Sequence, residues 1–520
     1  MASRYSSYVC LIVLSMCCSA LYAQVPWSSY YTTTGDSLTA TDPVQLVQAA
    51  NGDLVVVCRM ADLPLHEHVR FLRMAADGTL ISAREYVFTT GAFIYTLAEL
   101  ADGRFVATGG ERTTNDAVML VLGPTGDLQS CRTLQLGSTG NITAVLPEPD
   151  TTLTASFWIN VGGYKALTAR FQPDAAQVTA TNVLIDASPG GLSVNAHCAD
   201  GGTYHGGAIY PTGTSEINLS LARTDIDGNV QWAEHLLAAG LTYMQGMAEL
   251  PDGGALVGGT FAPTPGDGYP FILRTDVNGA PLWMKYLMDT TGVSTGWAVR
   301  TTELLSPDTF LLIGKNEDSH AFRIAVDTAG NVLFADTWPE ATYFGDVQQA
   351  PNGDVLLTMG GATPNSTGLS PGVLRMHADL AMDCAPTPVD LTGVALSPTV
   401  ANTWSATTLT IPWLDITASI TQTTPSITPY DPCIQTVAAE HITEAPLLRA
   451  WPVPAADHVL VTGPRFEQLD VIDATGRVVL TRAFSATTFQ ELDVRAWASG
   501  LYHVRVRDHQ RWYAVALVKE

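Results

Sequence analysis

The chain has 520 residues, of which 15% are charged and 46% hydrophobic, and its formal net charge is −24 at pH 7. This length exceeds what one hydrophobic core holds, so we expect roughly two or three domains. The acidic balance argues against nucleic acid as a partner, because binding to phosphates needs clustered lysine and arginine. Forty-four glycines, 30 prolines and the lack of helical periodicity predict an all-β chain with many turns.

Residues 1–23 are predicted to be a secretory signal peptide. Arg4 precedes an apolar run over 9–21, and small residues follow it. This order is typical of exported proteins. The alternative is a lipoprotein signal at Cys17 or Cys18, whose preceding residues are poor fits to that motif. No later stretch reaches the ~18 apolar residues of a membrane helix, so we expect no transmembrane helix in the mature chain.

Residues 24–391 repeat a pair of turns with a period of about 50 residues. The first turn of each pair lies at 51–53, 102–104, 150–152, 200–202, 252–254, 307–309 and 352–354. The second turn lies at 77–78, 125–126, 173–174, 227–228, 278–279, 329–330 and 378–379. Asn-Gly and Asp-Gly, which recur here, tolerate the positive φ of tight hairpin turns. Two hairpins per period make a four-stranded blade, and seven periods predict a seven-bladed β-propeller.

The second turn has a recurrent acidic residue before it and an aromatic residue after it. The acidic residues are Asp225, Asp276 and Asp327, and the aromatic residues are Trp232, Trp283 and Phe334. This pattern resembles the repeats of quinoprotein-like propellers. We expect the aspartates to cap the turns and the aromatic rings to pack between blades. The alternative, calcium binding, lacks further oxygen ligands.

Blade seven lacks a last strand, because Cys384 and a proline-containing segment follow its second turn. Trp27 lies about 25 residues before Gly52, the same spacing as from Trp283 to Asp308. Residues 26–32 are therefore predicted to supply the outer strand of blade seven, which would pair both ends of the ring.

Residues 392–445 are rich in threonine and proline and are predicted to be a partly ordered linker. Cys384 and Cys433 bracket it and are predicted to form a disulfide, which is permitted in an exported protein. Cys58 follows a run of valines and is expected to be buried.

Residues 446–520 contain short alternating strands separated by turns at about 8–12-residue spacing, which predicts a small Ig-like β-sandwich. This segment resembles the type A C-terminal sorting domain of type IX secretion cargo. The residues that carry the resemblance are Pro452, Pro454, Asp473, Gly476, Gly500 and Tyr502. Val453 stands where the family usually has asparagine. The resemblance implies export through the type IX machinery to the cell surface or the medium. The alternative is an adhesive sandwich without a sorting role.

No signature of catalysis, metal binding or cofactor binding is found, so no catalytic residue, metal or cofactor is predicted. The sequence has no His-Glu-x-x-His and no phosphate loop. Ser370 lies in a Gly-x-Ser-x-Gly pattern, but no helix is predicted after it, as a nucleophile elbow requires. His66 and His68 could bind a transition metal; a solvated loop is the simpler interpretation.

Propellers bind ligands at the mouths of the central channel, and aromatic residues are expected near the start of the inner strands. These candidates are Tyr95, Tyr243, Trp297, Tyr343 and Phe344. They are suited to stacking on sugars or to clamping a peptide, or alternatively to packing between blades. The sequence favours a binding or adhesion module for a glycan or an envelope protein. The alternatives are an extracellular glycan-active hydrolase or lyase and a structural spacer.

Overall fold

The computed structural model describes residues 27–33, 39–62, 66–89, 91–114, 116–134, 140–160, 164–185, 190–211, 216–238, 240–290, 296–363, 369–380, 386–401, 404–432, 448–451, 454–473, 477–507 and 512–520. The predicted signal peptide and both cysteines of the predicted disulfide lie outside these residues. The chain divides into a ring unit, residues 1–434, and a C-terminal unit, residues 435–520. Apart from the 3-10 turn η1, Thr417–Ser419, every regular element in the described part is a β-strand.

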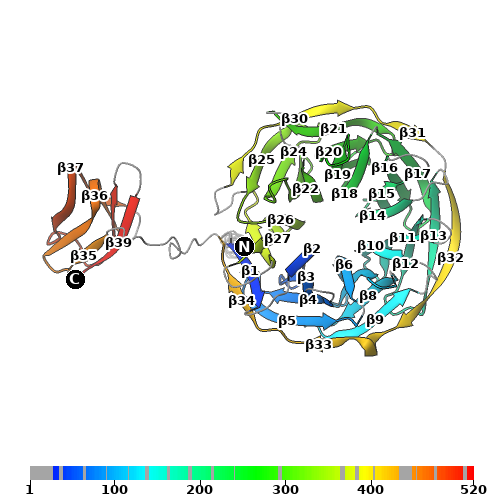
Figure 1. The fold of residues 1–520 in the computed structure, drawn as a ribbon, viewed down its shortest axis with the longest axis horizontal. Coiled ribbons are helices and arrows are strands. Elements are labelled where there is room, and N and C mark those ends of the chain that lie inside the picture. Colours follow the sequence, from blue (N-terminus) through cyan, green and yellow to red (C-terminus); the bar gives the residue numbers. More distant parts are fainter. Residues whose placement is uncertain are drawn as a thin grey trace, which may run out of the picture. The chain divides into compact units, whose positions relative to one another are not determined.

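The ring unit is built from four-stranded antiparallel sheets whose strands follow one another along the chain. Six of these runs are β2(Thr39–Gln48) β3(Leu54–Asp62) β4(His66–Met74) β5(Leu80–Val87); β6(Ala92–Glu99) β7(Phe105–Glu111) β8(Ala117–Leu122) β9(Leu128–Leu134); β10(Gly140–Pro147) β11(Leu153–Asn160) β12(Tyr164–Phe171) β13(Gln177–Ile185); β14(Gly190–His197) β15(Thr203–Ile209) β16(Asn218–Thr224) β17(Val230–Leu237); β18(Leu241–Glu249) β19(Ala255–Ala262) β20(Tyr269–Thr275) β21(Pro281–Asp289); and β22(Ala298–Ser306) β23(Thr309–Lys315) β24(Ala321–Val326) β25(Val332–Trp338). The first strand of each run lies nearest the centre of the ring (Figure 1).

The last run is completed from the N-terminus of the chain. Strands β26(Tyr343–Gln349), β27(Val355–Ala362) and β28(Leu369–Met376) form a hairpin meander. β1(Trp27–Thr33) pairs antiparallel with the outer edge of β28, with Trp27 opposite Arg375. The strand that closes the ring therefore comes from the segment at which the sequence placed it. Ser370, in the Gly-x-Ser-x-Gly pattern, is a buried residue of β28.

The hydrophobic core lies between neighbouring sheets. One cluster joins β6–β9 to β10–β13 through residues such as Val106 and Phe157, and another joins β2–β5 to the last run through Leu46 and Leu356. Each sheet buries both faces against its neighbours, which explains why central strands such as Ala117–Leu122 are apolar without alternation.

The second turns have the predicted caps. The Asp225 Oδ1 accepts the backbone N–H of Asp227 at 3.0 Å and that of Asn229 at 2.8 Å, and Asp276 and Asp327 repeat the pattern. The predicted packing of aromatic rings between sheets is also confirmed. The Trp232 Nε1–H donates to the Val277 carbonyl at 3.1 Å in the next sheet, and its ring lies against Gly279.

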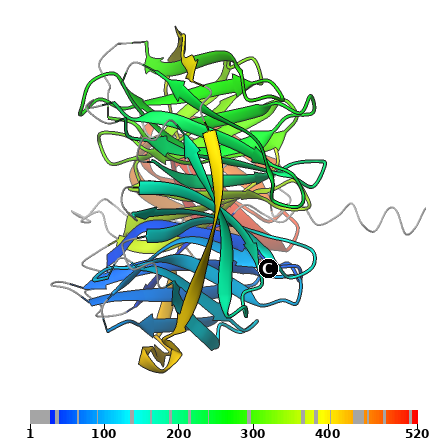
Figure 2. The same cartoon turned by 90° about the vertical axis from the view of Figure 1, so that its right-hand side faces the viewer.

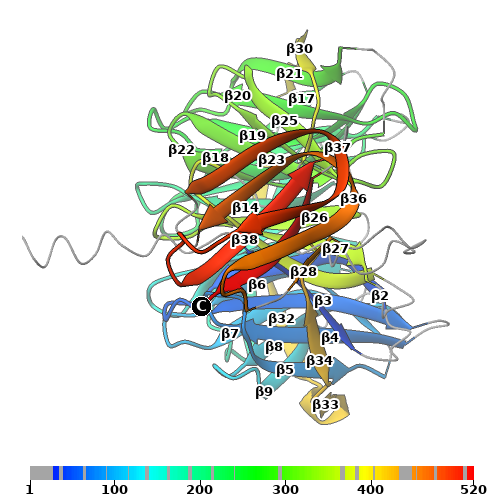
Figure 3. The same cartoon turned by 90° about the vertical axis from the view of Figure 1, so that its left-hand side faces the viewer.

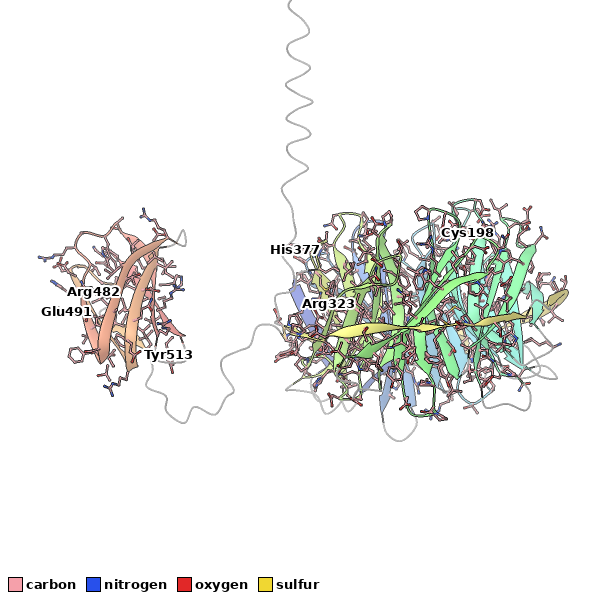
Figure 4. The ribbon with its side chains drawn as sticks, turned by 90° about the horizontal axis from the view of Figure 1, so that it is seen from above. Cys198, Arg323, His377, Arg482, Glu491 and Tyr513 are labelled. Carbon is pink, nitrogen blue, oxygen red and sulfur yellow. The ribbon has the colours of Figure 1, made fainter. Side chains whose placement is uncertain are left out.

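A long segment wraps around the outside of the ring and adds a further strand to every run of four. This segment, residues 386–432, is called the belt. Its strands are β29(Thr387–Pro388), β30(Leu391–Leu396), β31(Thr399–Ala401), β32(Trp404–Asp415), β33(Thr421–Thr423) and β34(Ile427–Tyr430). They lie on the rim in Figures 1 and 4.

The belt passes the sheets in the reverse of their order along the chain. β29 pairs with β25, β30 with β21 and β31 with β17. β32 then pairs with both β13 and β9 and joins two runs into one nine-stranded sheet (Figure 2). β33 pairs with β5 and β34 with β1. Most of the expected linker thus belongs to the ring unit, because its backbone groups satisfy the unpaired outer edges of the sheets.

The C-terminal unit is a five-stranded antiparallel sheet of β35(Arg449–Trp451), β36(His458–Asp473), β37(Val478–Asp493), β38(Gly500–Arg507) and β39(Trp512–Lys519). The long strands β36 and β37 pair along most of their length with several register shifts (Figure 3). Its core includes Val459, Leu469, Tyr502 and Val504.

Candidate functional site

A cavity of about 1000 Å³, here the channel cavity, lies at the centre of the ring unit. Residues from the first strand of every run line it. They include Gln45, Thr96, Val145, Asn195, Met247, Thr302 and Val347. This volume is at the upper end of the ~300–1000 Å³ that is usual for small-molecule sites. A ring of sheets therefore encloses a space large enough for a ligand.

Each inner strand carries a β-bulge in its first half. The bulges fall between Thr41/Val44, Ile94/Thr96, Ile142/Ala144, Leu192/Val194, Met244/Gly246, Val299/Thr301 and Phe344/Val347. A bulge inserts an unpaired residue and re-aims its side chain. The inserted residues that line the cavity are Tyr95, Thr143, Ser193, Gln245, Arg300, Gly345 and Asp346. The bulges thus place a collar of mostly polar side chains around the cavity.

One wall of the channel cavity is aromatic. Trp158 at the end of β11, Tyr210 just after β15 and Tyr243 at the start of β18 all line it. Tyr210 is 46% exposed and Tyr243 36% exposed, so both rings are accessible. Gly191 lies directly against Trp158, and a Cβ there would approach the Trp158 Cβ to 2.6 Å. These rings form an exposed apolar surface beside the polar collar.

Two carboxyl groups lie on the part of the wall formed by β22 and β26. Burial and the nearby charge of Asp346 raise the pKa of Glu303 to about 8. Burial also raises the pKa of Asp346, to about 6, although its Oδ2 accepts the Leu46 N–H and its Oδ1 the Val347 N–H, each at 2.9 Å. Near neutral pH, Glu303 is therefore largely a proton donor and Asp346 largely an acceptor. Such pairs of carboxyl groups with different environments serve acid–base chemistry in enzymes.

The five predicted aromatic residues fall into two groups. Tyr95 and Tyr243 line the channel cavity. Trp297 is 4% exposed and packs against Phe322 with the rings tilted, at 4.8 Å between ring centroids. Tyr343 and Phe344 are 3% and 1% exposed and belong to the cores between sheets. Only the first two have side chains that a ligand in the cavity can reach.

Four further residues line the cavity without having been predicted from the sequence: Trp158, Tyr210, Glu303 and Asp346. Trp158 and Tyr210 lie at the ends of second strands rather than at the start of inner strands, so the search for aromatic residues at the inner strands did not include them. Glu303 and Asp346 are separated by 43 positions and occupy different places relative to their bulges. No repeat-equivalent position therefore signals them.

Of the two histidines considered as metal ligands, the structure describes the side chain of His68, which pairs with a carboxylate. His68 Nδ1 lies 2.6 Å from Glu85 Oε1, and Arg70 bonds the other oxygen of Glu85 at 2.7 Å. The His66 side chain is outside the described part of the chain. Among the described residues, no group of three His, Cys, Asp or Glu side chains is placed to hold a metal ion.

Two residues of the sorting motif, Asp473 and Tyr502, stabilise turns of the C-terminal unit. Asp473 Oδ1 accepts the Arg477 N–H at 3.0 Å. The Tyr502 hydroxyl donates to the Ala498 carbonyl at 2.8 Å across the turn before β38, which begins at Gly500. Pro454 is exposed, and Pro452 and Gly476 lie outside the described residues.

Several solved structures, including the following three, are similar to this chain at low identity. A protein of unknown function from Dyadobacter fermentans has 13% identity and a TM-score of 0.39, over 68% of this chain and 99% of that one. Sqt1 from Chaetomium thermophilum has 11% identity and a TM-score of 0.40, over 68% and 99%. The extracellular domain of a putative hybrid two component system from B. thetaiotaomicron has 9% identity and a TM-score of 0.32, over 94% and 73%. None of these similarities bears on a ligand or an activity.

A known family matches the C-terminal unit of the chain. A comparison with curated proteins finds no match to the chain. In the part of the chain that is described, no helix has the length and apolar character needed to cross a membrane. Residues 449–520 match the family model of the secretion system C-terminal sorting domain. The chain therefore carries a type IX sorting domain, which indicates secretion and attachment at the cell surface.

Proposed function

We propose that this surface protein is a glycan-binding module whose ring unit is a seven-bladed propeller and whose ligand occupies the channel cavity. The observation that carries the proposal is the composition of the cavity wall. Exposed aromatic rings and a collar of hydroxyl, amide and guanidinium groups line the same cavity. Sugars present apolar ring faces and polar edges, and a site with both kinds of surface complements them.

The finer architecture is part of this proposal. Each four-stranded run is one blade, the strand of residues 27–33 completes the seventh, and the belt adds a fifth strand around the rim. The C-terminal unit is an Ig-like sandwich formed where the long strands β36 and β37 bend at their register shifts. The sorting domain delivers the protein, and the propeller acts at the surface.

A glycan array tests the proposal. The mature chain, residues 24–520, is screened on plant, algal and bacterial polysaccharides, and each hit is measured by calorimetry. Tyr243→Ala should weaken binding about tenfold, which corresponds to a stacking contribution of ~1–1.5 kcal/mol. Phe489→Ala is the matched control, because Phe489 is 62% exposed but belongs to the C-terminal unit. Equal affinities of the two variants, or no binding of the unmodified protein to any glycan, would refute the proposal.

The second candidate function is glycan cleavage by a hydrolase or lyase. It is favoured by Glu303 and Asp346, two neighbouring carboxyl groups whose pKa values are raised to different extents within the cavity. A protonated Glu303 would donate to the leaving oxygen, and the Asp346 carboxylate would act as a base or stabilise positive charge. Mass spectrometry of each bound glycan after incubation separates the two functions. Products that vanish in Glu303→Gln would establish cleavage, and intact glycans would leave binding alone.

A further inference from the structure

A buried hydrogen-bond network lies behind one polar residue of the channel cavity. Asn195 on β14 lines the cavity, and behind it lie Ser156 on β11 and His205 on β15, both fully buried. The Ser156 hydroxyl donates to Asn195 Oδ1. His205 Nδ1 lies 3.0 Å from the same Oδ1 and 3.0 Å from Ser156 Oγ. Three side chains from two adjacent blades thus meet at one amide oxygen.

The tautomer of His205 follows from its surroundings. Complete burial lowers the pKa of His205 to about 3, so the ring is neutral near pH 7. Its Nδ1 faces the Asn195 oxygen, which only accepts, so the proton resides on Nδ1. Its Nε2 then accepts from the Thr224 hydroxyl, 3.1 Å away. Asn195 Oδ1 consequently receives two hydrogen bonds, from Ser156 and from His205.

Because its oxygen already accepts two hydrogen bonds, the Asn195 side chain can offer a ligand in the cavity only hydrogen-bond donors. Its Nδ2 lies 3.4 Å from the Ala144 carbonyl oxygen, an acceptor, which fixes the amide in this orientation. The second N–H of Nδ2 makes no bond to a residue that the structure describes. A positioned NH₂ group with its oxygen already occupied selects an oxygen acceptor and disfavours a donor.

Arg300, another residue that lines the cavity, also has donors only. The two residues come from different blades, β14 and β22. Carbonyl-type oxygens accept hydrogen bonds without donating one, whereas a sugar hydroxyl does both. Uronate carboxylates and acetamido groups are the sugar substituents that carry such oxygens.

We propose that Asn195 is a specificity-determining residue of the channel cavity, held by the positioning residues Ser156 and His205, and that it selects sugars with a carboxylate or acetamido oxygen. This inference rests on the proposed function, because it names the class of glycan that the same cavity takes. The hydroxyl of a neutral hexose satisfies Asn195 less well, since its own proton then faces a group that offers no acceptor.

Three hexasaccharide probes test the inference on the mature full-length chain by calorimetry. They are hexagalacturonate, chitohexaose and cellohexaose, which carry carboxylate, acetamido and hydroxyl groups respectively. The unmodified protein should bind one of the first two at least tenfold more tightly than cellohexaose. Asn195→Asp should remove that preference, with a tenfold or greater loss confined to the preferred probe. Tighter binding of hexagalacturonate would indicate that a carboxylate supplies the oxygen, and tighter binding of chitohexaose would indicate an acetamido group.

Ser156→Ala removes one of the two hydrogen bonds that hold Asn195 Oδ1 and should reduce the preference severalfold. Ser220→Ala is its matched control, because Ser220 is an equally buried serine on β16 and makes no hydrogen bond to Asn195. A structural defect would weaken all three probes together, so equal losses across the probes would overturn the inference. A preference for cellohexaose, or an unchanged preference in Asn195→Asp, would also overturn it while leaving glycan binding intact. Failure of the unmodified protein to bind any glycan would overturn both proposals.

Discussion

The belt should contribute strongly to the stability of the ring unit, and Ile411 is the residue that tests this. Ile411 on β32 is 8% exposed and lies opposite Val178 on β13. It packs in the same cluster as Phe171. Ile411→Ala removes three carbon atoms, which at ~0.8 kcal/mol each accounts for ~2.4 kcal/mol. The cavity left behind adds to this loss, so we expect a total of about 2–4 kcal/mol.

The assay is urea unfolding of the mature chain, followed by tryptophan fluorescence and by hydrogen exchange. Thr410→Ala is the control, because Thr410 is exposed on the opposite face of the same strand. It should change the free energy of unfolding by less than ~0.5 kcal/mol. Exchange should accelerate along β32 in Ile411→Ala. If both variants unfold at the same urea concentration, the belt is a passive covering and the reasoning is wrong.

Three further predictions concern the turns, the cysteines and the channel. Gly279→Ala should destabilise the protein by about 1–3 kcal/mol in thermal unfolding, because Gly279 has φ +84° and a Cβ there would lie 2.5 Å from the Trp232 ring. Cys384 and Cys433 should be oxidised on thiol mapping, and their reduction should cost about 4 kcal/mol, the loop-closure value for ~50 residues. Glu303→Gln should stabilise the protein by roughly 2–4 kcal/mol at pH 8 and not at pH 4. The folded pKa of Glu303, about 8, exceeds its ordinary value of 4.5, so the penalty of burying the carboxyl grows as pH rises between these values. A pH-independent effect of Glu303→Gln would contradict this assignment.

The parts of the fold that the sequence predicted depend on local chemistry. The capped turn at Asp225 needs a side-chain oxygen and neighbouring backbone N–H groups, all within five residues. The packing of Trp232 follows because the residue after such a turn faces the adjoining sheet. The position of Trp27 was predicted because its distance to the next turn equals that from Trp283 to Asp308. Features of this kind recur, and recurrence made them visible.

The parts that the sequence did not predict depend on distant partners. Apart from β32, the strands of the belt have two to six residues, and β29 has only two. Their partners lie up to several hundred residues away, as in the pairing of Tyr30 with Tyr430. A proline-containing run of two to six residues has no strand signal of its own. The outer edges of the blades supply the hydrogen-bonding groups that make it a strand.

The sequence pattern also does not reveal the collar of polar residues around the channel cavity, because the collar depends on bulges. A bulge changes where a side chain points without changing the apolar and polar pattern that the sequence displays. Arg300 and Ser193 would face a neighbouring sheet in a regular strand. At bulges, both residues line the cavity. The lining of the channel cavity therefore depends on backbone irregularities that periodicity does not reveal.

The belt also constrains where the sorting domain can be removed after export. Tyr430 lies opposite Tyr30, and Asp431 Oδ1 accepts a hydrogen bond from Ser28 at 3.0 Å, so the ring unit uses the chain at least to Asp431. The C-terminal unit begins its sheet at Arg449. A cut upstream of Asp431 would detach the pairing that covers β1, the strand that closes the ring. Processing that leaves a stable propeller should therefore fall between residues 432 and 448. Mass spectrometry of the surface form should give a C-terminus in this interval. A C-terminus within the belt, on a protein whose ring unit remains folded, would show that the belt is dispensable.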